Sequence, residues 1–257
     1  SGIPMPMVRD SCHNIIHGAL MQTRLFRGLD EHLSDPKYNK LAAIIFTDQK
    51  VSSYSSFLKI KAANPEYSDN MLAISMQDGT ERIIQKLNDF QPDFLTAYPS
   101  TIGPLINAAE EGKLDIHPKA IGFSAEVLSP EIYRRVKEVF NCAVLNNYCS
   151  TEGGEAAMTC DHGRLHINDD WVIIEPIDKD GNPVKDGEWS EGIYITDLTN
   201  YVQPIIRYYM SDRVKITREC ECGSNFPIME INGRVIEEIT IGGKTLSGIV
   251  ITHALQE

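Results

Sequence analysis

The residues best suited to chemistry lie in the segment Asn147–Gly154, which reads NYCSTEGG. Tyr148 offers a flat aromatic face on which a purine can stack. Thr151 offers a hydroxyl to a phosphate oxygen, and Glu152 offers the hard carboxylate oxygen that Mg²⁺ prefers. Similar strings also occur in ordinary capped turns, so this segment by itself predicts only a candidate nucleotide site.

Three other polar segments accompany it in a fixed order along the chain. Gly122–Glu126 (GFSAE) precedes it, whereas Ile205–Asp212 (IIRYYMSD) and Ile231–Arg234 (INGR) follow it. Taken singly, Asp212 could be a turn residue and Arg234 a partner in a surface ion pair. Four ordered segments over about a hundred residues make a far more specific pattern than any one of them.

Short apolar runs alternate with segments of helical period between Leu41 and Tyr148, which predicts a mainly parallel sheet with flanking helices. Ligands collect at the carboxyl ends of the strands of such a sheet, where two of the polar segments lie. The expected strands are Leu41–Thr47, Met71–Met76, Phe94–Tyr98, Ala120–Ser124 and Ala143–Asn147, and the expected helices are Asp10–Arg27, Gly79–Phe90, Ser100–Glu111 and Pro130–Phe140.

After Glu152 the pattern changes to short strands joined by turns such as Asp180-Gly181 and Asp186-Gly187. This half is expected to form an antiparallel, barrel-like or distorted sheet. The fold class is therefore α/β, with an α/β nucleotide-binding subdomain over residues 1–152 and a smaller β-rich subdomain over residues 153–235. The strands expected in the second half are His166–Pro176, Gly192–Leu198, Arg213–Thr217 and Pro227–Asn232.

In combination, the four segments resemble the phenylacetate–CoA ligase family of adenylate-forming enzymes, including capsule-biosynthesis relatives of the CapK type. Pro92–Ser100 and Leu165–Glu175 are also similar to this family, so the resemblance covers nearly the whole chain. It implies the N-terminal large-domain core of such an enzyme. The implied reaction is ATP-dependent activation of a carboxylic acid to an acyl-adenylate, followed by thioester formation with CoA.

The resemblance also implies a role for each matching residue. Thr151 would contact the α-phosphate and Glu152 would hold Mg²⁺, the two contacts closest to the chemistry. Both reactants are anionic, so the protein's task is alignment and charge neutralisation. The remaining assignments are Ser124, Ala125 and Glu126 lining the adenine pocket, Asn147 and Tyr148 contacting and stacking the adenine, Asp212 binding the ribose hydroxyls, and Arg234 reaching the ribose or phosphate.

Both ends of the chain differ from complete family members. Ser1–Pro4 (SGIP) resembles the tail of the family's phosphate loop, and Glu257 falls where its C-terminal lid would begin. The resemblance thus implies a chain cut short at both ends, with a hinge and the start of a missing lid over residues 236–257. Ile236 stands where the family usually has an acidic hinge residue. We therefore expect little or no turnover from this chain alone.

A metal site is predicted around Cys220–Gly223 (CECG), because two thiolates on a tight turn are typical of a zinc knuckle. Cys160 with either His166 or His162 could complete a tetrahedral structural Zn²⁺ site. His166 is favoured because its apolar neighbours place it on a strand. Some members of the family carry such a site, and the resemblance implies Cys160, His166, Cys220 and Cys222 as its ligands here. Unligated thiols and a surface histidine are the alternative.

Composition narrows the possible partners and location. The formal net charge is −12, from 36 acidic and 24 basic residues, which disfavours nucleic acid and anionic membranes as partners. No apolar run approaches the roughly 20 residues needed to cross a bilayer, so we expect no membrane association. The six cysteines are read as reduced thiols, and the chain is expected to be cytoplasmic.

Two function classes remain open. The first is an acid–CoA ligase whose partners are ATP, CoA and a small carboxylic acid, aryl acids such as phenylacetate included. The second is a non-catalytic nucleotide-binding or scaffold module, possibly in capsule polysaccharide biosynthesis. His13 and His17, spaced for one helix face, could line an acyl pocket. The identity of the acid, the acceptor thiol and the formation of a homodimer are left open.

Overall fold

The structure is a computed structural model that describes residues 6–48, 51–235, 239–241 and 244–246. The predicted phosphate-loop tail Ser1–Pro4, the hinge position Ile236 and the end of the chain from residue 247 lie outside the described residues. The described residues divide into two compact units: Gly28–Asn146, here called the α/β unit, and the residues before Gly28 together with those from Asn147 onward, here called the β-rich unit.

The α/β unit contains a parallel sheet in the order β5-β4-β3-β1-β2. Strand β5 supplies this sheet only with its first half, since Asn147 onward belongs to the β-rich unit. The strands are β1 (Leu41–Ile45), β2 (Met71–Ser75), β3 (Phe94–Ala97), β4 (Ala120–Phe123) and β5 (Ala143–Ser150). The helices are α2 (Ser52–Ala63), a 3-10 turn (Pro65–Asn70), α3 (Thr80–Phe90), α4 (Pro99–Glu110) and α5 (Pro130–Phe140).

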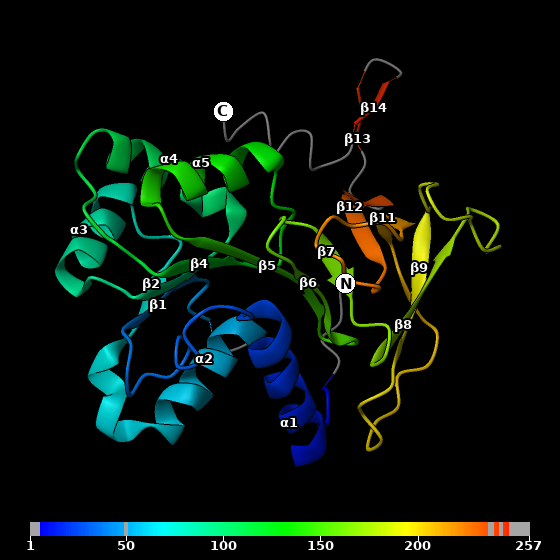
Figure 1. Cartoon of the computed structure of the whole chain (residues 1–257), viewed down its shortest axis with the longest axis horizontal. Helices are drawn as coiled ribbons and strands as arrows, with labels where there is room; N and C mark the ends of the chain where they lie inside the picture. The colour runs from blue at the N-terminus through cyan, green and yellow to red at the C-terminus, as the bar shows by residue number, and fades with distance from the viewer. Residues whose placement is uncertain (1–5, 49–50, 236–238, 242–243, 247–257) are drawn as a thin grey trace. The chain divides into compact units, whose positions relative to one another are not determined.

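Helices cover both faces of this sheet, as Figure 1 shows. Along β1, Ala42 and Ile44 belong to the core cluster that includes side chains of α3, α4 and α5. Their neighbours Ala43 and Ile45 pack on the opposite face, against α2. Strand residues alternate between faces, so a sheet buried on both sides needs continuous apolar runs. The predicted architecture of parallel strands with flanking helices is therefore confirmed.

Helix α5 illustrates how local signals set element boundaries. Ser129 is its N-cap, and the Ser129 hydroxyl accepts a hydrogen bond from the Ile132 N–H at 3.1 Å. Pro130 occupies the first turn, where its missing N–H has no cost. The helix ends at Asn141, whose φ of 47° turns the chain out of the helix. Both ends lie where the sequence predicts them.

The β-rich unit is antiparallel throughout its described strands. One sheet has the order β11-β12-β7-β6-β5, another the order β10-β9-β8, and β13 pairs with β14. Its elements are α1 (Ser11–Leu20), a π-helical turn (Met21–Leu25), β6 (Gly154–Thr159), β7 (Leu165–Ile167), β8 (Val172–Ile177), β9 (Gly192–Asp197), β10 (Tyr208–Met210), β11 (Asp212–Thr217), β12 (Ile228–Arg234), β13 (Ile239–Ile241) and β14 (Lys244–Leu246).

The structure differs from the sequence-based prediction within His166–Pro176, which was expected as one strand. The chain instead forms β7 and β8 in different sheets, separated by a turn after Asn168. The Asn168 side chain donates to the Glu155 carbonyl at 2.6 Å and accepts from Arg24 Nη1 at 2.7 Å. The Trp171 and Val172 N–H groups both return to the Asn168 carbonyl, which closes the turn.

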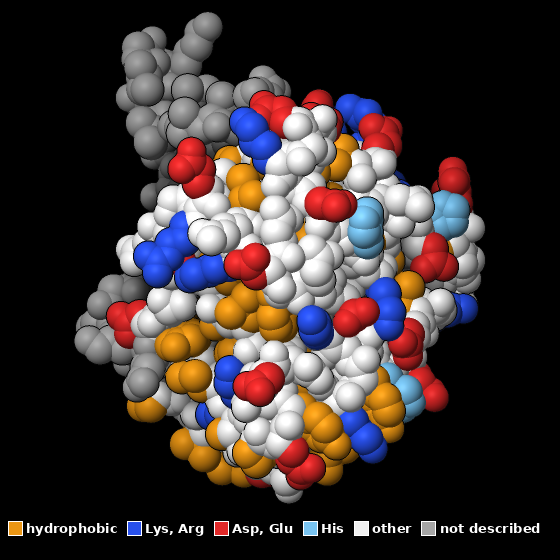
Figure 2. Space-filling model, turned by 90° about the vertical axis from the view of Figure 1, so that its left-hand side faces the viewer, with side chains coloured by type: hydrophobic (Ala, Val, Ile, Leu, Met, Phe, Trp, Pro, Cys, Tyr) orange, Lys and Arg blue, Asp and Glu red, His pale blue; other side chains and the backbone are white. Residues whose placement is uncertain are grey.

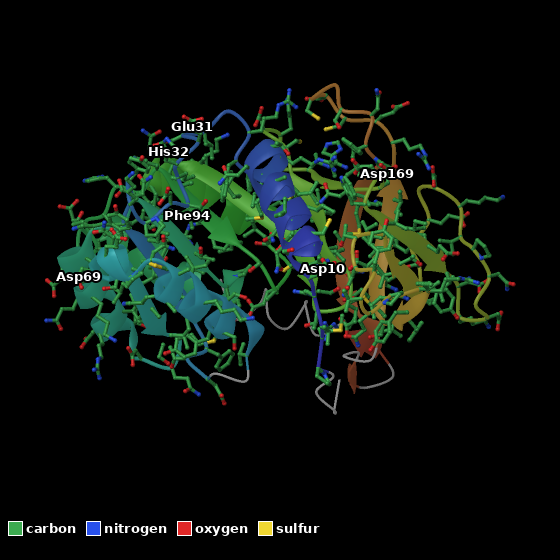
Figure 3. All side chains as sticks on the ribbon, turned by 90° about the horizontal axis from the view of Figure 1, so that it is seen from below. Asp10, Glu31, His32, Asp69, Phe94 and Asp169 are labelled. Atoms are coloured by element: carbon green, nitrogen blue, oxygen red, sulfur yellow. The ribbon has the colours of Figure 1, made fainter. Side chains whose placement is uncertain are left out.

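The predicted helix Asp10–Arg27 is regular only as far as Leu20, after which it becomes the π-helical turn. Asp10 caps α1 by accepting a hydrogen bond from the His13 N–H at 2.8 Å, and Figure 3 shows Asp10 at the start of this helix. Both α1 and the π-helical turn contact β6. The N-terminal segment thereby packs on the strand that follows the candidate nucleotide loop.

Acidic and basic side chains lie beside one another on the face shown in Figure 2. In the α/β unit, the Lys119 ammonium lies 3.5 Å from the Asp30 carboxylate and 3.6 Å from the Asp93 carboxylate. Among the described residues, no helix has both the length and the apolar character needed to cross a membrane.

Candidate functional site

Three of the predicted nucleotide-binding residues meet in the β-rich unit. Tyr148 lies on β5, Asp212 begins β11, and Arg234 ends β12 directly opposite Asp212. The Tyr148 hydroxyl donates to Asp212 Oδ2 at 3.0 Å, and Arg234 Nε donates to Asp212 Oδ1 at 3.3 Å. Antiparallel pairing thus brings together residues that are 64 and 22 positions apart along the chain.

The surroundings of this triad suit a polar ligand at its edge. Asp212 is only 6% exposed, while nearly half of the Arg234 side chain faces solvent. Burial raises the pKa of Tyr148 far above its ordinary value, and the nearby Asp212 carboxylate raises it further. Tyr148 therefore remains a neutral donor at physiological pH. Each Asp212 oxygen keeps lone-pair capacity beyond these two hydrogen bonds, which vicinal hydroxyls could use.

Thr151 and Glu152 lie in the turn of residues 151–153 between β5 and β6, here called the β5–β6 turn. Thr151 is exposed and Glu152 is half-buried. The Gly153 N–H donates to Ser150 Oγ at 2.8 Å, and Arg9 Nη2 donates to the Thr151 carbonyl at 2.7 Å. The turn therefore presents the Thr151 hydroxyl and the Glu152 carboxylate from a backbone that these two hydrogen bonds hold in place.

The two glycines of this segment are required by packing within the protein. A Cβ at Gly153 would overlap Ile195 Cδ1, and a Cβ at Gly154 would overlap the imidazole of His17. Gly154 also has a φ of +58°, in the left-handed region that favours glycine. The backbone at these two glycines therefore lies close to the side chains of Ile195 and His17.

Asn147 precedes Tyr148 and is oriented by the half-buried carboxylate of Glu155. Its Nδ2 donates to Glu155 Oε2 at 2.5 Å. Burial raises the pKa of Glu155, whereas the hydrogen bond from Asn147 acts in the opposite direction. Since the amide nitrogen is committed to Glu155, the Asn147 amide has a defined orientation.

Ser124, Ala125 and Glu126 follow β4 in the α/β unit. Ala125 has a φ of +70°, an uncommon conformation for a residue with a Cβ. The Glu126 carboxylate accepts from the Ser100 N–H at 2.8 Å and from the Ser100 hydroxyl at 2.9 Å, so it caps the start of α4. Any ligand contact by this segment would therefore be made mainly through its backbone.

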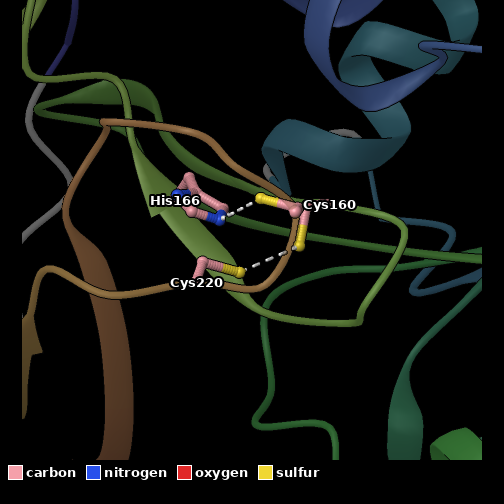
Figure 4. Close-up of side chains that lie close together, drawn as sticks. Cys160, His166 and Cys220 are labelled. Atoms are coloured by element: carbon pink, nitrogen blue, oxygen red, sulfur yellow. Dashed lines mark hydrogen bonds between the residues drawn. The ribbon is translucent and has the colours of Figure 1, made fainter.

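The four predicted zinc ligands Cys160, His166, Cys220 and Cys222 lie together in the β-rich unit, with their ligand atoms within 4.8 Å of one another. Figure 4 shows Cys160, His166 and Cys220 converging. Cys160 Sγ lies 3.8 Å from Cys220 Sγ, and Cys222 Sγ lies 3.4 Å from His166 Nε2. His162, the other candidate, is 46% exposed and lies beside the Glu221 carboxylate.

These distances fit a tetrahedral metal better than a disulfide. Two thiolates at about 2.3 Å from a tetrahedral Zn²⁺ are about 3.8 Å apart, whereas bonded sulfurs are about 2.05 Å apart. His166 Nδ1 lies 2.8 Å from the Phe226 carbonyl, so a proton on Nδ1 would leave the Nε2 lone pair directed at the cluster. The residues present therefore fit a closed N1S3 structural site.

The thiols of this cluster differ in acidity. Burial opposes ionisation of Cys220, but hydrogen bonds from the Cys222 N–H and from Cys222, His166 and Cys160 lower its pKa to about 7. Burial raises the pKa of Cys160 to about 11. Cys220 is thus the first thiolate of the pair, a suitable starting ligand for a metal cation.

Arg207, in the polar segment Ile205–Asp212, forms an exposed ion pair with Glu175 at 3.1 Å. Sequence reasoning missed a hydrogen-bonded cluster of His13, His17, Asp197 and Thr199, although the spacing of the two histidines already placed them on one helix face. The signal that could have found it is the Asp-x-Thr of residues 197–199, a local side-chain-to-backbone motif.

Known proteins are similar to parts of this chain. No family model matches the chain. It is 28% identical over 138 residues to protein CapK of Staphylococcus aureus, covering 53% of this chain and 29% of CapK. It is 30% identical over 176 residues to a phenylacetate-coenzyme A ligase of Thermus thermophilus, covering 64% of this chain and 39% of that protein.

The chain is thus similar over part of its length to phenylacetate-coenzyme A ligases and to CapK. The predicted resemblance is thereby confirmed. Among solved structures, 2-hydroxyisobutyryl-CoA ligase in the postadenylation state matches with a TM-score of 0.65 and 21% identity, over 84% of this chain and 48% of that one. This match confirms the predicted fold class. The chain spans 29% of the length of CapK and 39% of the length of the Thermus thermophilus ligase.

Proposed function

We propose that this chain is the nucleotide-binding core of an enzyme that activates a carboxylic acid with ATP. The observation that supports this most directly is the hydrogen-bonded triad of Tyr148, Asp212 and Arg234, which sequence resemblance had already assigned to adenosine. Tyr148 stacks the adenine and Asp212 accepts hydrogen bonds from the two ribose hydroxyls. Arg234, half-exposed beside them, reaches the ribose or the phosphate.

In the proposed reaction a substrate carboxylate oxygen attacks the α-phosphorus of ATP. The bond from the α-phosphorus to the bridging oxygen breaks, and pyrophosphate leaves with that electron pair. A thiolate of CoA then attacks the acyl carbon, which forms the thioester and releases AMP. Neither step needs a redox partner. The protein contributes alignment and charge neutralisation, for which Thr151 and Glu152 are the nearest groups.

Magnesium belongs to this proposal through Glu152, whose carboxylate is a suitable hard ligand on an accessible turn. Bound there, the ion would neutralise phosphate charge. Asn147 completes the adenine contacts of the β-rich unit, held in place by Glu155. The assignment of Ser124, Ala125 and Glu126 to the adenine rests on the sequence resemblance.

We further propose a structural Zn²⁺ held by Cys160, His166, Cys220 and Cys222, supported by the convergence of their ligand atoms. The ion would tie the turn after β6 and the start of β7 to the knuckle between β11 and β12. All four coordination positions are supplied by the protein, so this zinc would stabilise the fold and take no part in the reaction.

A second candidate is a nucleotide-binding module without ligase activity, because CapK, one of the similar proteins, is not named as a ligase. Pyrophosphate exchange with a panel of carboxylic acids separates the two proposals. Acid-dependent exchange in a protein containing this chain supports the ligase. Its absence with every acid, with nucleotide binding retained, supports the module. In a ligase, Glu152→Ala and Asp212→Ala should each lower exchange strongly, and wild-type rates in either variant would contradict the role proposed for that residue.

A further inference from the structure

The N-terminal segment holds the β5–β6 turn at two points. At the first residue of the turn, Arg9 Nη2 donates to the carbonyl of Thr151 at 2.7 Å. After it, the backbone N–H of Glu155 donates to His17 Nδ1 at 3.1 Å. Glu152 lies between these two attachments. Since Arg9 and His17 lie on one continuous segment, the segment forms a bracket across the turn.

The hydrogen bonds around His17 define where its proton lies. Nδ1 accepts from the Glu155 N–H, so a neutral imidazole must carry its hydrogen on Nε2. Nε2 lies 3.2 Å from Thr199 Oγ1, to which it can donate. The Thr199 hydroxyl donates a hydrogen bond to Asp197 Oδ1 at 2.5 Å. Thr199 is therefore the acceptor for His17.

His13 completes this network. Its Nδ1 lies 2.7 Å from Thr199 Oγ1, whose single hydrogen is already directed at Asp197, so His13 must also donate to Thr199. Thr199 then uses its hydrogen and both lone pairs. The Thr199 N–H adds a 2.7 Å bond to the same carboxylate oxygen of Asp197, a side chain only 2% exposed. The buried charge is thus stabilised by donors.

A metal ion is an alternative reading of this cluster, because ligand atoms of His13, His17 and Asp197 lie within 4.8 Å of one another. A metal would need the lone pairs of His13 Nδ1 and His17 Nε2, and both of these nitrogens carry protons in this network. The displaced proton of His17 could not move to Nδ1, which faces the Glu155 N–H donor. The hydrogen-bond pattern therefore favours a proton-bearing network over a metal site.

Burial keeps both histidines neutral near physiological pH. It lowers the pKa of His17 to about 4, with His13 and Arg9 acting in the same direction and Asp197 opposing them. Burial likewise lowers the pKa of His13. The Nδ1 lone pair of His17 is therefore available to the Glu155 N–H throughout the physiological range.

We propose that His17, assisted by Arg9, is a positioning residue that sets the conformation of the β5–β6 turn and so the places of the Thr151 hydroxyl and the Glu152 carboxylate. The close packing of the His17 ring on Gly154 supports this role, since a Cβ there would overlap it. For its effect on nucleotide binding, the inference rests on the proposed function. For its effect on the turn, it rests only on the contacts of Arg9 and His17.

The test compares His17→Leu, which removes both hydrogen bonds, with His17→Asn, whose Oδ1 can replace Nδ1 as acceptor. His117→Leu is the matched control, because His117 is 84% exposed and remote in sequence from the turn. Amide hydrogen exchange of the full chain reads out the turn directly. His17→Leu should speed exchange of the Glu155 amide at least about tenfold, and His17→Asn should restore protection. Unchanged exchange in His17→Leu would overturn the inference.

Calorimetric titrations with MgATP and with adenosine supply the functional readout. His17→Leu should weaken MgATP binding at least about tenfold, about 1.4 kcal/mol, and leave adenosine binding within about twofold, because only phosphate and metal contact the turn. Equal losses for both ligands, or none for MgATP, would overturn the inference. If the wild-type chain binds neither ligand, the proposed function fails, whereas the exchange experiment still decides the role of His17.

Discussion

Replacing Gly154 by alanine tests the packing at the β5–β6 turn most sharply. Gly154 has a φ of +58°, which costs a residue with a Cβ about 1–2 kcal/mol. The new methyl group would also overlap the His17 imidazole, and such overpacking costs about 1–3 kcal/mol. Gly154→Ala should therefore lower the free energy of unfolding by about 2–5 kcal/mol.

Removing the His17 imidazole should remove the cost of overpacking. In a His17→Ala background, Gly154→Ala should cost only the backbone part, so the double-mutant cycle should show a coupling of about 1–3 kcal/mol between the two sites. Urea unfolding followed by tryptophan fluorescence is the assay. Both tryptophans, Trp171 and Trp189, lie in the β-rich unit, so the signal reports on the unit that is altered.

Gly181 provides the matched control for this cycle. Its φ is +82° and the space around a Cβ is open, so Gly181→Ala carries the backbone cost without a clash. It should cost about 1–2 kcal/mol in either background and show no coupling to His17. A coupling below about 0.5 kcal/mol for Gly154 and His17 would refute the claim that their contact shapes the turn.

The remaining predictions concern the triad, the zinc site, the adenine-side turn and pH. Tyr148→Phe removes a donor to the buried Asp212 carboxylate and should lower the free energy of unfolding by about 1–3 kcal/mol, measured by urea titration. An unchanged midpoint would argue against the contact. Metal analysis should find about one zinc per chain, and Cys222→Ser should abolish binding and lower the melting temperature; a zinc-free wild-type protein would contradict the site. Ala125→Gly relieves the φ of +70° and should leave stability unchanged or raise it by up to about 1 kcal/mol, whereas a clear loss would show that the methyl group is needed. The pKa of His17 is lower in the folded chain than its ordinary value near 6.5, so the contribution of His17 to stability is complete above about pH 6.5 and is lost as the pH falls toward 4. His17→Asn should flatten this part of the profile of stability against pH. An identical profile in the variant would count against a neutral buried imidazole.

Elements with strong periodicity and clear boundary signals could be predicted from the sequence. The strands of the parallel sheet and helix α5 lie within a few residues of their expected bounds, because buried strands need unbroken apolar runs and the Ser129-Pro130 pair starts a helix unambiguously. Helix α2 was missed, since its polar and apolar residues lack a clear helical period. Strand β6 was missed because its GEAAMT sequence carries few strand-forming residues.

Part of the candidate site could likewise be predicted from the sequence, and part of it could not. The resemblance to a known family named in advance the three residues that meet at Asp212 and the four predicted zinc ligands, and the structure brings each set together. The hydrogen bonds that hold the β5–β6 turn could not be predicted. The attachments of Arg9 to Thr151 and of His17 to Glu155 join segments more than 130 residues apart, and backbone groups supply half of each contact. Backbone partners leave no trace in side-chain patterns.

The central claim is that Asp212, held between Tyr148 and Arg234, binds the ribose of an adenine nucleotide. Calorimetric titration of the full chain with ATP and Mg²⁺, comparing wild type with Asp212→Asn, tests it most directly, because the amide keeps the shape and loses the charge. We predict saturable binding of one nucleotide per chain by the wild type, weakened at least about tenfold in the variant. No binding by the wild type, or equal affinity in both proteins, would contradict the claim.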